Sequence, residues 1–476
     1  MTECCDAGSR STSTYDIAVI GAGSAGFSAA ITAAEEGANV ALIGHGTIGG
    51  TCVNVGCVPS KTMIRAAEAL HGARAAGRFP GLSGEAGVDD WRKLIAAKDD
   101  LVMTLRKKKY ADLLPEYNNI TYLEGAARLN GAGVILNDTP IAAGKTIITT
   151  GGRPSVPPIP GLEEVNYLTS TSVLELETLP ESLIVIGGGY IGAEIAQMMA
   201  RMGVQVTVVC RSRLLPQVEP EISDALADAF RAEGMKLYCG IAYDACREDE
   251  TGVTVCVKEG DTLLELKAEQ LLVATGRTPN TEGLGLAEAG IDLDKRGAIV
   301  VDDRMRTSRP GVYAAGDVTN RDQFVYMAAY GAKLAAKNAL NFDSLVYDNS
   351  AMPWVVFSDP QVAGVGFTEA AAKDNRYDVI TSTISLDHVP RALAARDTRG
   401  LIKLIADKKT DRLLGAQILA PEGADSIQTA ALAIKCGMTV TDLADTLFPY
   451  LTTVEGLKLA AQTFNKDVSK LSCCAG

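Results

Sequence analysis

A short glycine-rich pattern that occurs twice constrains the fold of this chain more than any other feature. Its first copy opens with a hydrophobic run, Ile17 to Ile20, continues as an alanine-rich stretch and closes with a second run, Val40 to Ile43. This order predicts a strand, a tight turn, a helix and a strand, the context in which spaced glycines place a pyrophosphate at a helix N-terminus. The G-x-G-x-x-G spacing is formed by Gly21, Gly23 and Gly26, and in the second copy by Gly187, Gly189 and Gly192. Two copies predict two nucleotides that face each other, a flavin and a nicotinamide.

The residue that ends each second strand indicates which nucleotide is bound, because an acid at this point holds a ribose hydroxyl. In the second copy this residue is Cys210, and Arg211 and Arg213 follow it. Guanidinium groups suit a 2′-phosphate, so we expect NADPH; a solvated basic turn is the alternative. In the first copy the residue is Gly44, where a flavin site of this type usually has Glu. Gly44 does not affect the predicted fold, but it leaves the ribose contact open.

Composition bounds the remaining possibilities. The chain has 476 residues, 47% of them hydrophobic, enough for roughly three domains with cores of their own. A formal net charge of −13 argues against nonspecific binding to nucleic acid. No hydrophobic run reaches the length of a membrane span, and the polar start MTECCDAGSRSTST is unlike a signal peptide. We therefore expect a cytoplasmic protein whose 11 cysteines serve as thiols, metal ligands or redox groups rather than as structural disulfides.

A pair of cysteines follows the first glycine pattern. Cys52 and Cys57 lie five residues apart in a glycine-rich turn that becomes a helix near Pro59. A helix N-terminus lowers the pKa of a thiol, and such a pair can close a disulfide and reopen it by exchange. Lys61 follows Cys57 by four residues and so lies on the same side of the first helical turns as Cys57, where its charge can stabilise a reduced, anionic flavin. The alternatives are two buried thiols and a surface lysine.

The segment GGTCVNVGCVPSK closely resembles the active-site signature of the pyridine nucleotide–disulfide oxidoreductases. The resemblance runs through essentially the whole chain from Tyr15 and includes ATGRTPN at Ala274 to Asn280 and YAAGDV at Tyr313 to Val318. It implies that Cys57 is the charge-transfer thiol beside FAD and Cys52 the thiol that exchanges with substrate. Electrons would run from NADPH through FAD to this pair.

The same resemblance implies roles for further residues. Asp317 is expected to bind the ribityl chain of FAD, and Lys61, near flavin N5, to pair with Glu194. Further FAD contacts are implied at Gly46, Thr51, Ala127 and Val325.

The expected fold class is α/β, with two Rossmann-like dinucleotide-binding domains, for FAD and NADPH as in glutathione reductase, and a C-terminal α+β dimerisation domain. In the family each active site uses both chains of a homodimer. The predicted boundaries are a disordered tail at 1–14, the FAD domain at 15–152 and 276–347, the NADPH domain at 153–275, the dimerisation domain at 348–466 and a flexible tail at 467–476.

A missing histidine indicates the electron acceptor. Disulfide reductases of the family protonate the leaving thiolate with a His–Glu pair near the C-terminus of the other subunit. The matching stretch here is FPYLTTVEGLKLAAQTF, in which Tyr450 stands at the His position and Glu455 at the Glu position. A tyrosine with a pKa of about 10 is a poor proton shuttle at neutral pH, so the acceptor should need no proton on a leaving thiol. A soft metal ion that prefers thiolates meets this demand.

The chain ends in LSCCAG, and the adjacent Cys473 and Cys474 can close a disulfide only in a strained ring, so they stay available as thiols. CVNVGC, the Tyr in place of His and this terminal pair together resemble the mercuric reductases within the family. That resemblance implies NADPH-dependent reduction of Hg(II) to Hg(0), and hence mercury resistance. Hg(II) would pass from small-thiol complexes to Cys473 and Cys474 of one subunit and then to Cys52 and Cys57 of the other. Tyr190 is expected to gate the nicotinamide pocket and contact the metal, or else to be a packing aromatic.

Many mercuric reductases carry an N-terminal metal-binding domain with a G-M-T-C-x-x-C motif, and we expect none here. Cys4 and Cys5 are either a reduced capture site or a chance pair. The other cysteines show no ligand spacing and are expected to be structural: Cys210, Cys239, Cys246, Cys256 and Cys436.

Three alternatives stay open. An NADPH-dependent reductase of a low-molecular-weight disulfide must explain the absent His. A metal-sequestering thiol protein leaves the two nucleotide folds unexplained. A subunit of a dehydrogenase complex would usually use NAD.

Overall fold

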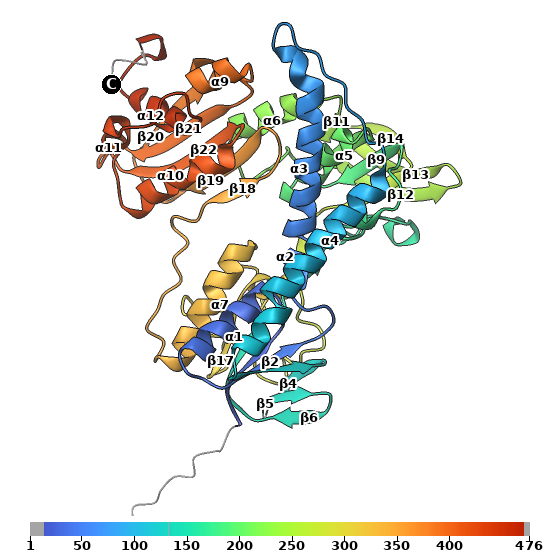
Figure 1. Ribbon diagram of the computed structural model, residues 1–476, viewed down its shortest axis with the longest axis vertical. Coiled ribbons are helices and arrows are strands. Elements are labelled where there is room, and N and C mark those ends of the chain that lie inside the picture. The colour runs from blue at the N-terminus through green and yellow to red at the C-terminus, as the bar shows by residue number, and fades with distance from the viewer. Residues whose placement is uncertain (1–13, 132, 471–476) are drawn as a thin grey trace, which may run out of the picture. The chain divides into compact units, whose positions relative to one another are not determined.

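The computed structural model describes residues 14–131 and 133–470. The described residues divide into two compact units (Figure 1). The first comprises the described residues up to Pro59 with Ala97–Pro154 and Arg277–Tyr347, and the second comprises Ser60–Ala96, Ser155–Gly276 and the described residues from Asp348 on. Two long helices, α3 (Cys57–Arg74) and α4 (Trp91–Lys109), contribute residues to both units.

The first unit is built on a parallel sheet with the strand order β17-β7-β1-β2-β3. Both faces of such a sheet are covered, which is why its central strands read as continuous hydrophobic runs. Helix α1 packs against α7 over this sheet (Figure 1). The strand, turn, helix and strand predicted from the first glycine pattern are confirmed. The elements are β1 (Tyr15–Ile20), α1 (Ser24–Glu35), β2 (Val40–Gly44), α2 (Gly50–Asn54), β3 (Ile120–Glu124), β7 (Ala143–Ile148), β17 (Val312–Ala314) and α7 (Val325–Leu340).

Antiparallel strands complete the first unit. One set is ordered β4-β5-β6, and a ribbon pairs β8 with β16. The ribbon joins the segment that leaves this unit after Pro154 to the segment that re-enters it at Arg277. The elements are β4 (Ala127–Asn130), β5 (Gly133–Leu136), β6 (Thr139–Ile141), β8 (Gly152–Pro154) and β16 (Arg277–Pro279).

The second unit contains the second glycine pattern in a parallel sheet ordered β11-β10-β9-β15. An antiparallel sheet, β12-β13-β14, packs beside it through a shared hydrophobic core. The elements are β9 (Ser182–Ile186), α5 (Tyr190–Arg201), β10 (Gln205–Cys210), α6 (Pro220–Ala232), β11 (Lys236–Cys239), β12 (Ala242–Asp249), β13 (Gly252–Glu259), β14 (Thr262–Ala268) and β15 (Gln270–Val273).

The C-terminal part of the second unit is an antiparallel sheet ordered β18-β19-β22-β21-β20 with helices packed on it (Figure 1). Alternating burial in β20 fits a strand with one solvated face. The elements are β18 (Trp354–Val356), β19 (Gln361–Gly366), α8 (Glu369–Asp374), β20 (Val379–Ser385), α9 (Pro390–Ala395), β21 (Leu401–Asp407), β22 (Leu413–Ala420), α10 (Gly423–Lys435), α11 (Val440–Asp445) and α12 (Glu455–Gln462).

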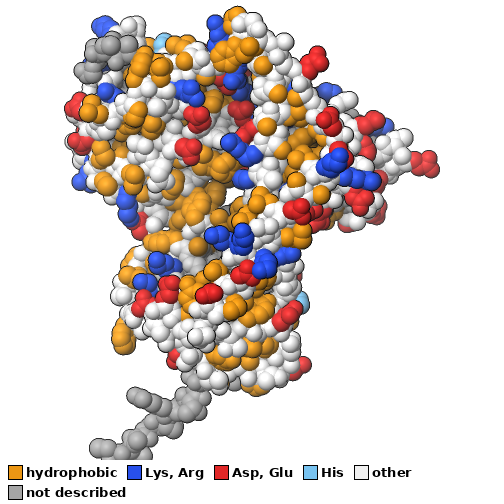
Figure 2. Space-filling view, viewed as in Figure 1, with side chains coloured by type: hydrophobic (Ala, Val, Ile, Leu, Met, Phe, Trp, Pro, Cys, Tyr) orange, Lys and Arg blue, Asp and Glu red, His pale blue; other side chains and the backbone are white. Residues whose placement is uncertain are grey.

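The predicted domain boundaries stay a prediction. The sequence did not indicate that Ser60–Ala96 packs with the second unit, where Met63, Ile64 and Trp91 join the core beneath α5. None of the helices in the described residues is long and apolar enough to cross a membrane. Basic and acidic side chains are interspersed on the face shown in Figure 2, so the described residues present no broad basic field there.

Candidate active site and nucleotide sites

The first glycine turn is held by close backbone contacts. A Cβ on Gly26 would fall on the carbonyl oxygen of Gly21, and Gly21 itself has a φ of +117°. A Cβ on Gly50 would stand 2.6 Å from the Cα of Gly23, and Gly23 forms a bridge with Gly49. The turn that precedes the cysteine pair is therefore packed backbone to backbone against the turn that opens α1.

The cysteine pair lies at the junction of two helices. Cys52 is in the short helix α2, Cys57 is the first residue of α3, and both side chains are half-buried. Asn54 fixes the loop before them, because its amide nitrogen donates to the carbonyl oxygens of Ile48 and Gly50 at 2.9 Å each. The two thiols are thus carried by a braced turn at a helix N-terminus, where thiolate is favoured.

Tyr110 is a neighbour of the pair that the sequence did not indicate. Its hydroxyl lies 3.1 Å from the Ser24 hydroxyl, and its ring meets Phe27 edge to face with ring centroids 4.9 Å apart. Burial raises the pKa of Tyr110; the hydrogen bond with Ser24 opposes this, and the nearby charges of Cys52 and Cys57 add to it. The phenol therefore stays protonated beside the thiols.

The ion pair expected between Lys61 and Glu194 is confirmed. Lys61 Nζ lies 2.7 Å from Glu194 Oε2, one helical turn after Cys57 on α3. The other oxygen, Glu194 Oε1, accepts a hydrogen bond of 2.9 Å from the Phe357 backbone N–H. Lys61 Nζ also stands 5.0 Å from the centre of the Phe357 ring. A carboxylate that is only 6% exposed thus fixes the position of the lysine.

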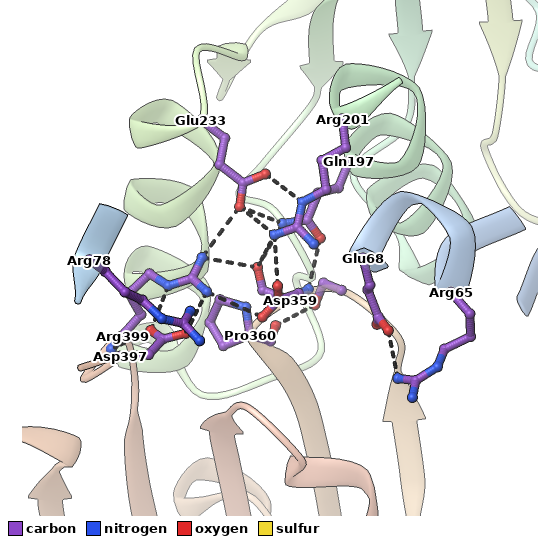
Figure 3. A network of polar contacts seen from close by, with 11 residues as sticks. Arg65, Glu68, Arg78, Gln197, Arg201, Glu233, Asp359, Pro360, Asp397 and Arg399 are labelled. Atoms are coloured by element: carbon purple, nitrogen blue, oxygen red, sulfur yellow. Dashed lines mark hydrogen bonds and ion pairs between the residues drawn. The ribbon is translucent and has the colours of Figure 1, made fainter. Parts of the chain in front are cut away.

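Glu194 is one of three buried polar residues on a single face of α5. Gln197 and Arg201 continue this face at helical spacing and are 3% and 5% exposed. Gln197 donates to the Asp359 carbonyl at 2.7 Å and accepts from the Asp359 N–H at 2.7 Å. Figure 3 shows Gln197 and Arg201 converging with Glu233 on the segment at Asp359. This network anchors α5, and with it Glu194, to the strand segment that also supplies Phe357.

Asp317 follows Gly316 at the start of a 3₁₀ turn, Asp317–Thr319. Arg277 Nε donates to Asp317 Oδ2 at 2.9 Å, so this carboxylate is oriented by a cation of its own unit. The other FAD contacts expected from the resemblance lie in the same unit, at the starts of elements or in turns. They are Gly46 before α2, Thr51 within α2, Ala127 at the start of β4 and Val325 at the start of α7.

The second glycine turn repeats the backbone of the first but leaves more space. A Cβ on Gly192 would fall on the Gly187 carbonyl oxygen, as at the first turn. Apart from Gly189 and its two chain neighbours, no described residue has an atom within 4 Å of the position that a Cβ on Gly189 would take. This opening is what a pyrophosphate needs in order to approach the backbone.

The two arginines after β10 differ in environment. Arg211 is exposed. Arg213 instead donates from one terminal nitrogen to the carbonyl oxygens of Pro216 and Val218, at 3.1 and 2.7 Å, and its Nε is buried without a partner among the described residues. Arg213 therefore braces its own loop, and Arg211 is the better placed of the two to meet a phosphate.

Tyr190 is the first residue of α5 and stacks on Trp354 of β18, with ring centroids 5.7 Å apart and an interplanar angle of 18°. Burial raises the pKa of Tyr190 to about 12. The sequence did not indicate Trp354. The stacked pair therefore presents aromatic surface directly after Gly189, the second glycine of the turn.

Tyr450 precedes α12, the last α-helix of the described residues, and Glu455 begins it. Tyr450 is 55% exposed, whereas Glu455, the first residue of α12, is 8% exposed. Glu455 Oε2 accepts from the Leu451 N–H at 3.2 Å, so the buried acid holds the turn that presents Tyr450. Cys473, Cys474, Cys4 and Cys5 lie outside the described residues.

The described cysteines outside the active site are not all isolated. Cys210 and Cys239 were expected to be structural, but their sulfurs lie 3.2 Å apart. Within the described residues, no cluster of three or more His, Cys, Asp or Glu side chains is arranged to hold a metal ion.

Comparison with known proteins agrees with this geometry. The family model described as pyridine nucleotide-disulphide oxidoreductase matches residues 15–336, and the model for the dimerisation domain of that family matches residues 352–461. The mercuric reductase of Streptomyces lividans is 47% identical over 97% of this chain and 98% of its own length. That of Shigella flexneri is 48% identical over 97% of this chain and 82% of its own length.

Among solved structures, the HOCl-induced flavoprotein disulfide reductase RclA from Escherichia coli, in its Cu(II) complex, superposes with a TM-score of 0.82. It is 31% identical, and the match covers 95% of this chain and 99% of that one. The chain therefore belongs to the pyridine nucleotide-disulphide oxidoreductases and, within that family, groups with the mercuric reductases.

Proposed function

We propose that this protein reduces Hg(II) to Hg(0) with NADPH and so detoxifies mercury. The observation that carries the proposal is the identity of 47% to a mercuric reductase along nearly the whole of both chains. The balance is two electrons: NADPH and Hg(II) give NADP⁺, a proton and Hg(0). The protein acts in the cytoplasm as a homodimer, with residues 352–461 forming the dimerisation domain.

The first unit fits FAD. Its glycine turn has the close backbone packing that such a turn needs, and the Asp317 carboxylate, held by Arg277, is available to a ribityl hydroxyl. The chemistry that FAD supplies in such a site is two-electron transfer between a nicotinamide and a dithiol. Gly46, Thr51, Ala127 and Val325 line its remaining length in our proposal.

The second unit fits NADPH. Gly187, Gly189 and Gly192 shape the turn, and the open position at Gly189 admits the pyrophosphate. Arg211 binds the 2′-phosphate, while Arg213 holds the loop that carries it. Tyr190, stacked on Trp354, covers the nicotinamide end and stays neutral.

Cys52 and Cys57 bind Hg(II) between them, because two thiolates are the ligands that a soft, linear ion prefers. Lys61 contributes positive charge one helical turn from Cys57, and Glu194 keeps its amine in place. Tyr110 remains a neutral hydroxyl beside the thiols, so it adds no charge that would oppose thiolate formation.

Delivery of the metal uses the other subunit. Cys473 and Cys474 near the end of one chain capture Hg(II) from a small-thiol complex and pass it to Cys52 and Cys57 of the other chain by thiolate exchange. Tyr450, on its exposed turn, lies along the transfer path, and Glu455 holds that turn. Exchange of one thiolate for another needs no general acid, which explains why a tyrosine can replace the histidine.

The test follows NADPH oxidation by the purified protein with excess small thiol and Hg(II). Oxidised glutathione and lipoamide are the parallel substrates, since RclA shows that a relative with this fold reduces disulfides. We expect oxidation that depends on Hg(II), negligible turnover of either disulfide, and a large loss in Cys473→Ala/Cys474→Ala. Cys4→Ala/Cys5→Ala is the matched control for a terminal vicinal pair. Rapid disulfide turnover that Hg(II) inhibits would overturn the proposal.

A further inference from the structure

Two cysteines outside the active site lie side by side at the carboxyl ends of neighbouring parallel strands. Cys210 ends β10 and Cys239 ends β11, and the two are direct partners in the register of this strand pair. Their sulfurs are 3.2 Å apart. Cys210 is buried, whereas Cys239 is partly exposed and offers a way in from solvent. Their separation by 28 intervening residues hides this pairing in the sequence, because the register of the strands creates it.

The environment prepares one of these thiols for metal binding. Cys210 S–H donates to the Cys239 sulfur, and this hydrogen bond lowers the pKa of Cys239. The bond favours the thiolate form of Cys239, with the remaining proton on Cys210. Thiolates are the preferred ligands of soft metal ions.

We propose that Cys210 and Cys239 form a second Hg(II) site, separate from Cys52 and Cys57, in which the ion bridges their two sulfurs. Two Hg–S bonds to the protein form as two Hg–S bonds to a small-thiol carrier break. The Cys210 proton passes to one of the released thiolates, and no electron is transferred.

Occupancy of this site opposes NADPH binding, a consequence that rests on the proposed function. The Cys210 sulfur lies 3.1 Å from where a Cβ on Gly188 would stand, so it underlies the second glycine turn directly. Arg211, the proposed ligand of the 2′-phosphate, is the next residue. An ion on Cys210 therefore displaces the turn and the arginine together, and excess Hg(II) inhibits its own reduction.

Retention of Hg(II) tests the site without turnover. The protein is incubated anaerobically with Hg(II) and excess glutathione, without NADPH, then gel-filtered, and its mercury content per chain is measured. We expect Cys210→Ala/Cys239→Ala, and Cys239→Ser alone, to retain one Hg(II) fewer than the wild type. Cys246→Ala/Cys256→Ala is the matched control. It also removes two thiols from neighbouring strands of the second unit, but there the register pairs Cys246 with Val255 and not with Cys256. This variant should retain as much Hg(II) as the wild type.

Equal retention by the wild type and Cys210→Ala/Cys239→Ala overturns the proposal. So does a thiol titration showing that the pair is already oxidised to a disulfide before Hg(II) is added. In a Cys52→Ser/Cys57→Ser background, which stops turnover, Hg(II) should weaken NADPH binding at least about tenfold, and this effect should vanish when Cys210 and Cys239 are also replaced. Because retention is measured without NADPH, its failure is distinguishable from a failure of Hg(II) reduction.

A second inference concerns Gly44, where a flavin site usually has an acid. Tyr122 on the neighbouring strand β3 occupies the space above this glycine. A Cβ on Gly44 would meet the Tyr122 hydroxyl, and would stand 2.8 Å from its ring and 2.9 Å from the Ala22 Cβ. No hydrogen bond engages the Tyr122 hydroxyl among the described residues. We infer that this hydroxyl takes the place of the acid and hydrogen-bonds the adenosine ribose of FAD.

The affinity for FAD tests this second inference. Tyr122→Phe should raise the dissociation constant of FAD, measured by the recovery of flavin fluorescence, roughly two- to tenfold. Tyr117→Phe is the control, since that hydroxyl is bonded to Glu35 at the surface. Gly44→Glu/Tyr122→Ala, which restores an acid and removes the clash, should recover the affinity. If Tyr122→Phe releases FAD no more readily than the control, the inference is wrong.

Discussion

At the first glycine turn a Cβ on Gly23 would stand 3.5 Å from the Gly50 Cα, whereas at the second turn the same position on Gly189 is open to 4 Å. The first glycine turn packs against the turn that carries Cys52 and Cys57, and Gly44 ends the strand that follows its helix. The second turn faces an exposed Arg211 and has a thiol pair beneath it. In both glycine turns the third position has to be glycine, because a Cβ there would clash with the carbonyl oxygen of the first glycine.

This difference teaches that the glycine spacing determines only the backbone of a phosphate site. What the site binds is decided by residues that approach from neighbouring strands and turns. Substitutions that each change only one of the two turns can test this difference.

Loss of the thiols should have the largest effect. Cys52→Ser removes a ligand of Hg(II) from the first turn and leaves both nucleotide sites intact, so turnover should fall at least about a thousandfold. Steady-state NADPH oxidation with Hg(II) measures this, and FAD content and NADPH affinity should stay as in the wild type. Cys436→Ser, an exposed thiol elsewhere, is the control. Turnover within tenfold of the wild type would contradict the role of the pair.

Alanine substitutions at Gly192 and Gly189 in the second glycine turn should affect different properties, the first stability and the second NADPH binding. Gly192→Ala places a Cβ on the Gly187 carbonyl oxygen and should lower the free energy of unfolding by about 1–3 kcal/mol. Gly189→Ala meets open space and should leave that free energy within about 0.5 kcal/mol of the wild type, yet weaken NADPH binding. Urea denaturation and NADPH titration separate the two effects. Equal stability of both variants would contradict the packing described.

Arg211→Gln should raise the dissociation constant of NADPH roughly ten- to hundredfold, because it removes a charge-assisted hydrogen bond to the 2′-phosphate. The dissociation constant of NADH, which has no such phosphate, should stay nearly constant. Arg213→Gln is the comparison: it should lower thermal stability, since that side chain braces its loop. If Arg211→Gln weakened the binding of NADH as much as that of NADPH, Arg211 would not be a ligand of the 2′-phosphate.

Tyr190→Phe should have the smallest effect. With the pKa of Tyr190 raised to about 12, its phenol is already protonated throughout the working range, so removing the hydroxyl should not change the shape of the pH–rate profile between pH 6 and 10. The ring keeps its stack on Trp354, and we expect the rate to stay within about threefold of the wild type. Tyr190→Ala, which removes the ring, is the contrast. If the change in rate at alkaline pH that the wild type shows were absent from the pH–rate profile of Tyr190→Phe, the Tyr190 phenolate would take part in the reaction.

Much of the chain was predictable because its signals are local. Each glycine pattern lies within one strand–turn–helix unit, and the cysteine signature is contiguous. The ion pair of Lys61 with Glu194 was predictable only through the family resemblance. The packing of Gln197 and Arg201 against Asp359 was not, because it depends on which segment covers α5.

The same limit applies to the strand partners. Tyr122 above Gly44 and Cys239 beside Cys210 are brought together by strand register, which no spacing in the sequence reveals. Arg213 shows the converse. Its place two residues after Arg211 suggested a shared role, yet its side chain donates its hydrogen bonds to carbonyl oxygens of its own loop.

Quantifying mercury vapour against NADPH tests the central claim most directly. The purified holoenzyme is mixed anaerobically with NADPH, excess glutathione and Hg(II), and Hg(0) swept into a trap is compared with the NADPH consumed. We predict one Hg(0) for each NADPH oxidised, and none from Cys52→Ser. NADPH consumption without Hg(0), or Hg(0) from Cys52→Ser at the wild-type rate, would contradict reduction of Hg(II) at the Cys52–Cys57 pair.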